Sequence, residues 1–383
     1  MAGKALQRRF GEARRMIGLL GATGAVGQAT AAELRALAAG DLRLGARLRT
    51  SETLDSAAKV SIVDIDDDDA LARFCADCRV VVNCAGPSHR FLDRVALAAL
   101  SAGADYVDAA GDDPVHERLA SFVPPAGERT VIVSAGMMPG LSGLLPRWLA
   151  SHGFDRLDRL TAYVGGLDRF TLAAAGDYLA SLRNGYGESL ASWRNGRRAP
   201  ATLEPLRDIE LPFFAGPITA YPFMSTETER LARALKIGEV NWYNVFGDGR
   251  ALAAISRLHG SIHAGVDLDV AAVELVAAAE IDVAGRTPYQ LLVFQLDGET
   301  GGMPRTRSLM LRARDSYRLT GCVAAFATAA LLRGGVQPGL HYAADVLDPE
   351  GVVERLRETS IVAALEAFDE PLAANDTIER GTL

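Results

Sequence analysis

Three glycines directly after the first apolar run have the spacing of a nucleotide-binding turn. Residues 16–20 read as a buried strand, the segment GATGAVG follows at 21–27, and an Ala- and Leu-rich helical stretch covers 28–39. In such a turn the first glycine permits the tight bend, the second lets the backbone approach a pyrophosphate, and the third lets helix and strand pack closely. The phosphate then lies on the amides of the helix N-terminus. We expect dinucleotide contacts from Gly21, Thr23, Gly24, Ala25, Val26 and Gly27; the alternative is a tight turn that binds no nucleotide.

The end of the second strand distinguishes NAD from NADP. Residues 42–46 read as this strand, and NAD-binding proteins usually carry Asp or Glu at its end to hold the ribose 2′-hydroxyl. Here Arg47, Arg49 and Thr50 follow instead. A guanidinium group offers paired donors that suit a phosphate. NADP is therefore the predicted cofactor, with these three residues near its 2′-phosphate; the alternative is a pair of solvated surface arginines.

Three later strands also end in small residues. Strands are predicted at 79–83, 106–108 and 130–134, and ligands of open α/β sheets bind at the carboxyl ends of parallel strands. We therefore predict further cofactor contacts at Cys84, Ala85, Gly86, Pro87, Ala109, Gly136 and Met137.

The elements that position these residues alternate strand and helix through the first part of the chain. This order predicts an α/β fold with a doubly wound parallel Rossmann sheet. Beyond about residue 158, the segments 281–283, 289–296 and 308–312 read as closely spaced strands, which predicts a second α+β domain with a mixed or antiparallel sheet. The predicted divisions are a flexible leader at 1–15, a Rossmann NADP-binding domain at 16–150, a second domain at 151–315 and a C-terminal helical segment at 316–383.

Composition excludes several other classes of protein. The net charge of −8 gives no support to a nucleic-acid partner. No apolar run reaches the roughly 18 residues of a membrane helix, and the polar, basic N-terminus lacks the apolar stretch of a signal peptide. We expect a cytoplasmic protein without a metal: Cys75 and Cys78 lack a second pair of ligands, and His259 and His263 lack a third.

Several longer segments together resemble the saccharopine dehydrogenase-like reductases. They are VVNCAGP at 81–87, AGADYVDAAGD at 102–112, SAGMMPGLSGLLPRWL at 134–149, TGCVAAFATAALLRGG at 320–335 and PGLHYAADVLDPEGVVERL at 338–356, besides the glycine turn. The resemblance implies that the C-terminal segment returns to the Rossmann domain and that the middle domain binds substrate and forms a homodimer. The family often has an aromatic residue after the Gly-Pro of the fourth strand, where this chain has Ser88-His89-Arg90.

Two other families share a similar glycine opening but need residues that this chain lacks. Short-chain dehydrogenases need a Tyr four residues before a Lys, and the residues four before Lys59 and Lys236 are Asp55 and Ala232. Aspartate-semialdehyde dehydrogenases need a nucleophilic Cys between the domains, and no Cys lies between Cys84 and Cys322.

The resemblance implies hydride transfer between a nicotinamide and the carbon of a C=N bond, with a proton supplied by the protein. The candidate proton donors are His89, which follows the Gly-Pro loop, Asp112, Tyr178 and Tyr186. Their alternatives are an exposed loop histidine, a helix cap before Pro114, and core packing for both tyrosines.

The substrate is open to three hypotheses. The compact chain is similar to the thiazolinyl imine reductases of siderophore assembly, which implies a carrier-protein-tethered imine and a nonribosomal peptide synthetase as partner. An amino-acid or opine-type dehydrogenase would instead hold carboxylates with arginines, for which Arg169, Arg183, Arg197 and Arg198 are available. A non-catalytic NADP-binding sensor is the third hypothesis.

Overall fold

The computed structural model of the protein describes residues 16–47, 60–123, 127–247 and 249–372. The chain divides into two compact units, which we describe separately. The first consists of residues 1–140 and 320–347, and the second of residues 141–319 and 348–383. The predicted leader at 1–15 and the candidate cofactor residues Arg49 and Thr50 lie outside the described residues.

The first unit is built on a parallel sheet. Its 7 strands run in the order β16-β6-β5-β4-β1-β2-β3, and every neighbouring pair is parallel. This order reverses direction at β1 and β4, which is the arrangement of a Rossmann sheet and confirms the predicted fold class. The strands are β1 (Met16–Leu20), β2 (Asp41–Ala46), β3 (Val60–Ile62), β4 (Val80–Asn83), β5 (Asp105–Asp108), β6 (Thr130–Val133) and β16 (Gly339–Tyr342).

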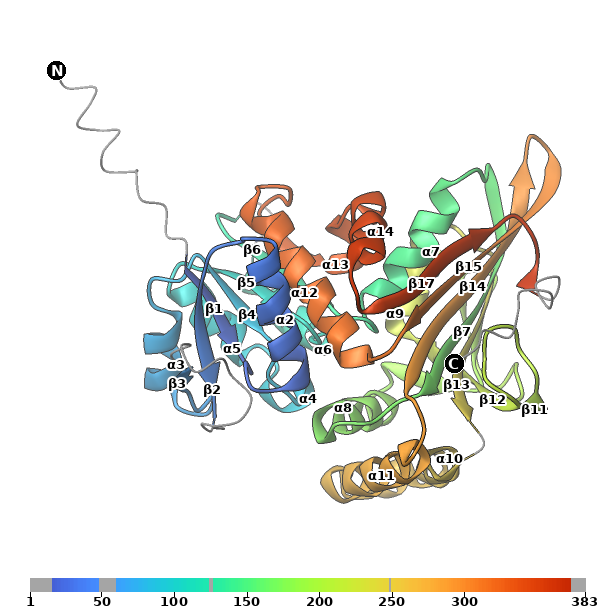
Figure 1. The fold of residues 1–383 in the computed structure, drawn as a ribbon, viewed down its shortest axis with the longest axis horizontal. Helices are drawn as coiled ribbons and strands as arrows, with labels where there is room; N and C mark the ends of the chain where they lie inside the picture. Colours follow the sequence, from blue (N-terminus) through green and yellow to red (C-terminus); the bar gives the residue numbers. More distant parts are fainter. Residues whose placement is uncertain (1–15, 48–59, 124–126, 248, 373–383) are drawn as a thin grey trace. The chain divides into compact units, whose positions relative to one another are not determined.

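The central strands of this sheet are covered on both faces, and β4 and β6 each contain three consecutive apolar residues. All residues of β4, β5 and β6 are buried. The helices of the unit are α2 (Ala25–Ala36), α3 (Asp68–Cys75), α4 (Ser88–Phe91), α5 (Arg94–Ser101), α6 (Asp113–Leu119), α13 (Ala343–Val346) and α12 (Ser316–Leu332) from Thr320 onward. Helices α2 and α12 lie side by side (Figure 1), where a Cβ on Gly321 would come within 2.7 Å of the Val26 carbonyl oxygen.

Asp67 caps α3, as the acidic run before this helix predicts. Its side chain accepts a hydrogen bond from the Ala70 amide at 2.9 Å. The sequence predicts a helix at 91–102. The structure has α4 ending at Phe91 and α5 beginning at Arg94, with Leu92 between them at a positive φ of 46° that is not helical.

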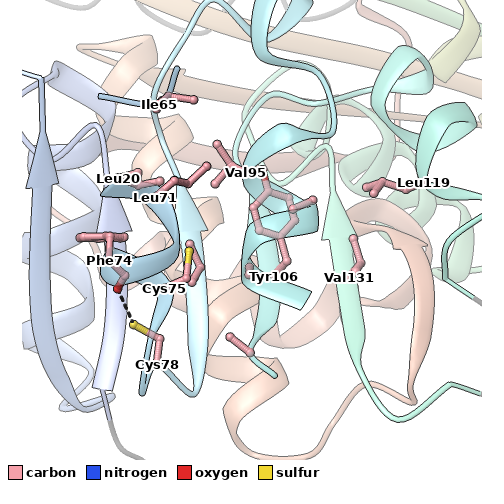
Figure 2. Close-up of a cluster of buried hydrophobic side chains, with 14 of the residues drawn as sticks. Leu20, Ile65, Leu71, Phe74, Cys75, Cys78, Val95, Tyr106, Leu119 and Val131 are labelled. Carbon is pink, nitrogen blue, oxygen red and sulfur yellow. Dashed lines mark hydrogen bonds between the residues drawn. The ribbon is translucent and has the colours of Figure 1, made fainter. Parts of the chain in front are cut away.

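Cys75 and Cys78 belong to the hydrophobic core between α3, α5 and the sheet (Figure 2). Both side chains are fully buried, and the Cys78 thiol donates to the Phe74 carbonyl oxygen at 3.5 Å. Burial raises the pKa of the Cys75 thiol to about 12, with the neighbouring Cys78 adding to the shift. Within the described part of the chain, no group of three or more His, Cys, Asp or Glu side chains is arranged to hold a metal ion.

The second unit contains a large mixed sheet of 10 strands. Its main path is β10-β9-β13-β7-β14-β15-β17, in which β13 and β7 are parallel and the other neighbours are antiparallel. Strand β12 continues the sheet from β13 and pairs with β8 and β11. The strands are β7 (Arg156–Leu167), β8 (Gly187–Ser189), β9 (Ser192–Arg194), β10 (Arg197–Ala199), β11 (Leu206–Ile209), β12 (Ile218–Ser225), β13 (Glu239–Gly247), β14 (Tyr289–Thr300), β15 (Met303–Ala313) and β17 (Val362–Phe368).

The helices of this unit are α7 (Leu141–Ser151), α8 (Leu172–Arg183), α9 (Thr226–Ala234), α10 (Arg250–Ser261), α11 (Leu268–Val283) and α14 (Pro349–Glu358). Helices α8, α10 and α11 form one apolar cluster that also includes Phe223 of β12. In the described residues, no helix has the length and apolar character needed to cross a membrane.

Three predictions about the chain differ from the structure. The segment 281–283, with the sequence Ile-Asp-Val, is the last turn of α11 and not a strand; so short a segment does not distinguish the two. The C-terminal segment 316–383 does not return to the Rossmann unit as a whole: α12, β16 and α13 do, but α14 and β17 belong to the second unit, where β17 pairs with β15. The boundary between the Rossmann unit and the second unit also falls at Gly140, before α7, and not at the predicted residue 150.

Candidate functional site

The glycine turn leads from β1 into α2 and is closed by its own backbone. Gly21 has a positive φ of 74°, and its carbonyl oxygen accepts the Gly24 amide at 3.0 Å. A Cβ on Gly27 would lie 2.2 Å from that same oxygen, closer than any side chain permits. A Cβ on Gly24 would meet it at 3.3 Å, a tight contact that a shift of a few tenths of an ångström would relieve. Gly21 and Gly27 are therefore needed for the turn itself, and Gly24 leaves space above it.

The N-terminus of α2 is suited to an anion. Its N-cap is Gly24, which provides no side-chain cap, and the first turn holds no acidic residue. Helices α3, α8, α9, α11 and α14 each have an Asp, Ser or Thr side chain that accepts an N-terminal amide. An uncapped, positively polarised helix end beside a glycine turn fits the pyrophosphate of a dinucleotide.

A buried carboxylate joins the loops that follow β4 and β5. Asp108 accepts hydrogen bonds from the Tyr106 hydroxyl at 2.6 Å and from the Asn83 side-chain amide at 3.2 Å. Its other oxygen accepts the backbone amides of Ala110 and Gly111 at 2.9 and 2.8 Å. Burial raises the pKa of Tyr106 well above its usual range, and the adjacent Asp108 adds to this. Asp108 thus fixes the path of both loops.

The loop after β4 carries four predicted cofactor residues. The Asn83 side-chain oxygen accepts the Ala85 amide at 3.1 Å, which turns the chain toward Gly86 and Pro87. Cys84 contacts Thr30 of α2, with 3.4 Å between Sγ and Oγ1. Burial raises the pKa of the Cys84 thiol to about 12, so this thiol is a packing group and not a nucleophile.

The loop after β6 comes close to the loop after β5. A Cβ on Gly136 would lie 2.4 Å from the Ala109 carbonyl oxygen, so only glycine fits there. The Met137 amide donates to the Thr320 hydroxyl of α12 at 3.3 Å. The predicted cofactor residues after β1, β4, β5 and β6 are therefore gathered at the carboxyl edge of one sheet. Arg47 follows β2 at the same edge and is exposed.

The four candidate proton donors do not belong to one unit. His89 lies partly buried in α4, and Asp112 directly precedes α6, where its side chain accepts the Ser134 hydroxyl at 3.0 Å and does not cap the helix. Tyr178 and Tyr186 belong to the second unit. Tyr186 precedes β8, and its carbonyl oxygen accepts the Thr226 amide at 3.0 Å. Tyr178, in α8, is hydrogen bonded to His259 at 2.8 Å.

Sequence reasoning missed the residues that support the cofactor loops. Four of them lie in or beside the strands whose ends it identified: Asn83, Tyr106, Asp108 and Ser134. The fifth, Thr320, lies in α12. The available signal was their polar character in otherwise apolar strands, because a buried polar side chain needs hydrogen-bond partners.

Comparison with known proteins agrees with this geometry. Residues 17–130 match the family model for the saccharopine dehydrogenase NADP binding domain. A probable mitochondrial saccharopine dehydrogenase-like oxidoreductase from Arabidopsis thaliana is 33% identical over 95 residues. That alignment covers 24% of this chain and 21% of the relative, so the chain matches about a fifth of the relative's length.

Solved structures extend the likeness of the fold over both units. Apo saccharopine dehydrogenase (L-Glu forming) from Saccharomyces cerevisiae aligns with a TM-score of 0.65 and 17% identity, covering 92% of this chain and 100% of the yeast chain. An engineered D-amino acid dehydrogenase bound to NADP+ aligns with a TM-score of 0.47 and 16% identity, over 90% of this chain and 99% of that one. The fold of the yeast enzyme thus extends over both units, and residues 17–130 match an NADP binding domain, which makes NADP the cofactor.

Proposed function

We propose that the protein is an NADPH-dependent oxidoreductase that reduces a C=N bond. The observation that carries the proposal is the glycine turn and uncapped α2 within a matched NADP-binding domain. The two-unit fold shared with the yeast saccharopine dehydrogenase supports chemistry at a carbon–nitrogen bond. NADPH supplies the hydride when bound. The chain's own residues hold its pyrophosphate and 2′-phosphate and shape the loops after β4, β5 and β6.

Within this proposal, the substrate that we assign first is a thiazolinyl imine of siderophore biosynthesis. The substrate would be carried as a thioester on a nonribosomal peptide synthetase, and the enzyme would act in the cytoplasm as a homodimer. The support for this finer assignment is the resemblance of the quoted sequence segments to the compact reductases of that kind.

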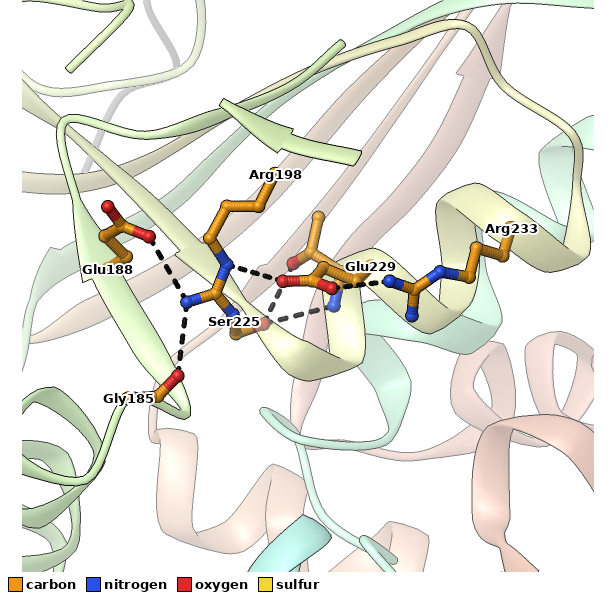
Figure 3. Close-up of polar contacts among 7 residues, drawn as sticks. Gly185, Glu188, Arg198, Ser225, Glu229 and Arg233 are labelled. Carbon is orange, nitrogen blue, oxygen red and sulfur yellow. Dashed lines mark hydrogen bonds and ion pairs between the residues drawn. The ribbon is translucent and has the colours of Figure 1, made fainter. Parts of the chain in front are cut away.

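Three of the four arginines named for carboxylate binding in an opine-type dehydrogenase already have partners in the structure. Arg198 donates to Glu188, Glu229 and the Gly185 carbonyl oxygen (Figure 3), so its charge is already compensated. Arg169 pairs with Glu280 at 3.3 Å, and Arg183 donates to the Val266 carbonyl oxygen. A saccharopine-type dehydrogenase remains the second candidate because the yeast structure with that name has the same fold.

The proposal is tested by measuring the change in NADPH absorbance with each of two candidate substrates. The purified protein is mixed with NADPH and a 2-arylthiazoline-4-carboxylate carried as its pantetheine thioester, and separately with NADP+ and saccharopine. We expect NADPH oxidation on the thiazoline and no reaction with saccharopine. Gly24→Ala is the matched control, because it retains the turn but narrows the space for the pyrophosphate.

Each other outcome selects a different function. Reduction of NADP+ by saccharopine, with an inert thiazoline, would overturn the imine assignment in favour of the second candidate. Tight NADPH binding without turnover of either compound would favour the non-catalytic sensor.

A further inference from the structure

Helix α11 of the second unit is apolar on more sides than its contacts within that unit cover. One face packs with α8 and α10 in a single apolar cluster through Ala271, Ala272 and Leu275. A helix with one covered face is usually polar on the other. In α11, however, 12 of the 16 residues are apolar, and the remaining four are Asp269, Glu274, Glu280 and Asp282. The outer face is therefore apolar as well.

The exposed apolar residues form one stripe along the outer face of α11. Val270, Val273 and Ile281 have exposed fractions of 65%, 56% and 54%. Ala277 lies between them and is also exposed. The steps along the stripe are three, four and four residues, which keeps all four side chains on one side of the helix. From Val270 to Ile281 the stripe is about 16 Å long.

Glu274 and Glu280, which flank the stripe, are each paired with an arginine of the same chain. Glu274 accepts Arg257 of α10 at 2.5 Å, and Glu280 pairs with Arg169 at 3.3 Å. These pairs neutralise the margins of the stripe, so the margins of two copies would not repel each other. A helix that lies on an anionic membrane carries Lys or Arg on its polar face instead. The margins therefore favour a protein surface as the occupant.

The two ends of the stripe carry opposite charges. Asp269 is exposed beside the first residue of the stripe, and Arg286 is exposed three residues beyond the end of α11. If two copies of the helix lie side by side in opposite directions, Asp269 of each copy comes within reach of the long Arg286 side chain of the other. If they lay in the same direction, like charges would meet. The stripe is thus complementary in charge to a reversed copy of itself.

We propose that α11 is the contact surface of a two-fold symmetric homodimer, in which the stripes of the two copies pack in opposite directions. Val273 of each copy then lies near Ala277 of the other, where the small alanine allows the helices to approach closely. Val270 lies near Ile281 of the other copy. Every residue of this surface belongs to the second unit. The proposal goes beyond the proposed function, because it does not depend on the substrate or on reductase activity.

The first test is sedimentation velocity of the full chain without nucleotide, at concentrations from about 1 to 100 µM. We expect a species of twice the mass of one chain at the upper concentrations. Val273→Glu places two carboxylates near the two-fold axis and should raise the dissociation constant of the dimer by about 100-fold or more. Because Val273 is exposed, the variant should keep the circular dichroism spectrum and the NADPH affinity of the native protein.

Met303→Glu is the matched control, because it also places a carboxylate at an exposed apolar position of the second unit. Met303 is 69% exposed at the start of β15, in the hairpin with β14, which lies far from α11 (Figure 1). This variant should dimerise like the native protein.

Exchange of the end charges tests the direction of the two helices. Asp269→Arg and Arg286→Asp should each raise the dissociation constant by about 10-fold, because each change places like charges together at both ends of the interface. The double variant, with both changes, should restore the native dissociation constant, since opposite charges face each other again. Helices in the same direction would give no such restoration.

Three results would overturn the proposal. They are a native protein that stays monomeric at all concentrations, a Val273→Glu variant that dimerises like the native protein, and an equal loss in Met303→Glu. A double charge variant that dimerises no better than the single variants would overturn the reversed arrangement. Failure of the proposed function is a separate result: a protein that dimerises through α11 but reduces no imine with NADPH would overturn that function alone.

Discussion

The carbonyl oxygen of Gly21 lies 2.2 Å from the position that a Cβ on Gly27 would occupy. The same oxygen is 3.3 Å from the corresponding position on Gly24. The two glycines therefore have different roles although they belong to one motif. Gly27 allows α2 to approach β1, and Gly24 keeps the surface above the turn open to a phosphate.

Replacement of each glycine by alanine should have different effects: Gly27→Ala should mainly lower stability, and Gly24→Ala should mainly weaken cofactor binding. Gly27→Ala should lower the free energy of unfolding by about 2 kcal/mol or more, because backbone atoms cannot move away from the new methyl group. Gly24→Ala should unfold within about 1 kcal/mol of the native protein but bind NADPH at least 10-fold more weakly, which corresponds to about 1.4 kcal/mol. Urea unfolding and fluorescence titration measure the two effects. Equal stability of the two variants would contradict this division of roles.

Removal of the Asp108 charge should lower the free energy of unfolding. Asp108→Asn places an amide N–H against hydrogen-bond donors and leaves buried groups without an acceptor, so we expect a loss of about 2–4 kcal/mol in the free energy of unfolding. Tyr106→Phe is the control that removes one of the four bonds and should cost about 1 kcal/mol. A urea midpoint for Asp108→Asn equal to that of Tyr106→Phe would show that Asp108 does not organise the two loops.

Acid should destabilise the second unit through His259. Its pKa is about 4 in the folded protein and 6.5 in the unfolded chain, so between these values the unfolded state binds more protons. The contribution of His259 to the free energy of unfolding is fully present above pH 6.5 and is lost as the pH falls toward 4. The change between pH 7 and pH 4.5 is on the order of 2 kcal/mol. Urea unfolding of the native protein and of His259→Gln at both pH values isolates this contribution; parallel pH dependence in the two proteins would refute it.

Cys75 and Cys78 should be unreactive in the folded protein. Both thiols are fully buried, and the raised pKa of Cys75 leaves almost no thiolate at pH 8. Iodoacetamide at pH 8, followed by peptide mass spectrometry, should leave them unmodified until urea is added. Chelators should not change the melting temperature. Rapid native modification of either residue would show a redox or metal-binding role for the C-x-x-C segment.

The first unit could be predicted because its signals are local. Buried parallel strands are continuous apolar runs such as Val80-Val81-Val82, and the glycine turn follows β1 directly. The positions of the cofactor loops at the strand ends follow from the parallel order alone. What the sequence does not show is how Asp108 joins the two loops, because Asn83 is 25 residues away and is brought to Asp108 by the register of β4 and β5.

The second unit was less predictable because its contacts are distant in sequence. Strand β17 pairs with β15 across a segment that contains α12, β16 and α14. No local pattern shows that the chain returns to this sheet. Tyr178 was a candidate on residue type alone, and its partner His259, 81 residues away, was assigned a structural role. Helix α11 ends in Ile281-Asp282-Val283, and this alternation of apolar and polar residues is also typical of a short strand.

The most direct test of the account is a fluorescence titration with NADPH and with NADH, on the native protein, Arg47→Ala and Arg35→Ala. Arg47 is exposed beyond β2 at the cofactor edge, and Arg35 is an exposed arginine in the last turn of α2, the end away from the glycine turn, so both variants lose the same charge. We predict that NADPH binds more tightly than NADH, that Arg47→Ala weakens NADPH about 10-fold or more with little change for NADH, and that Arg35→Ala matches the native protein. Binding of neither nucleotide, or equal losses in both variants, would contradict the assignment of the turn and of Arg47 to NADP.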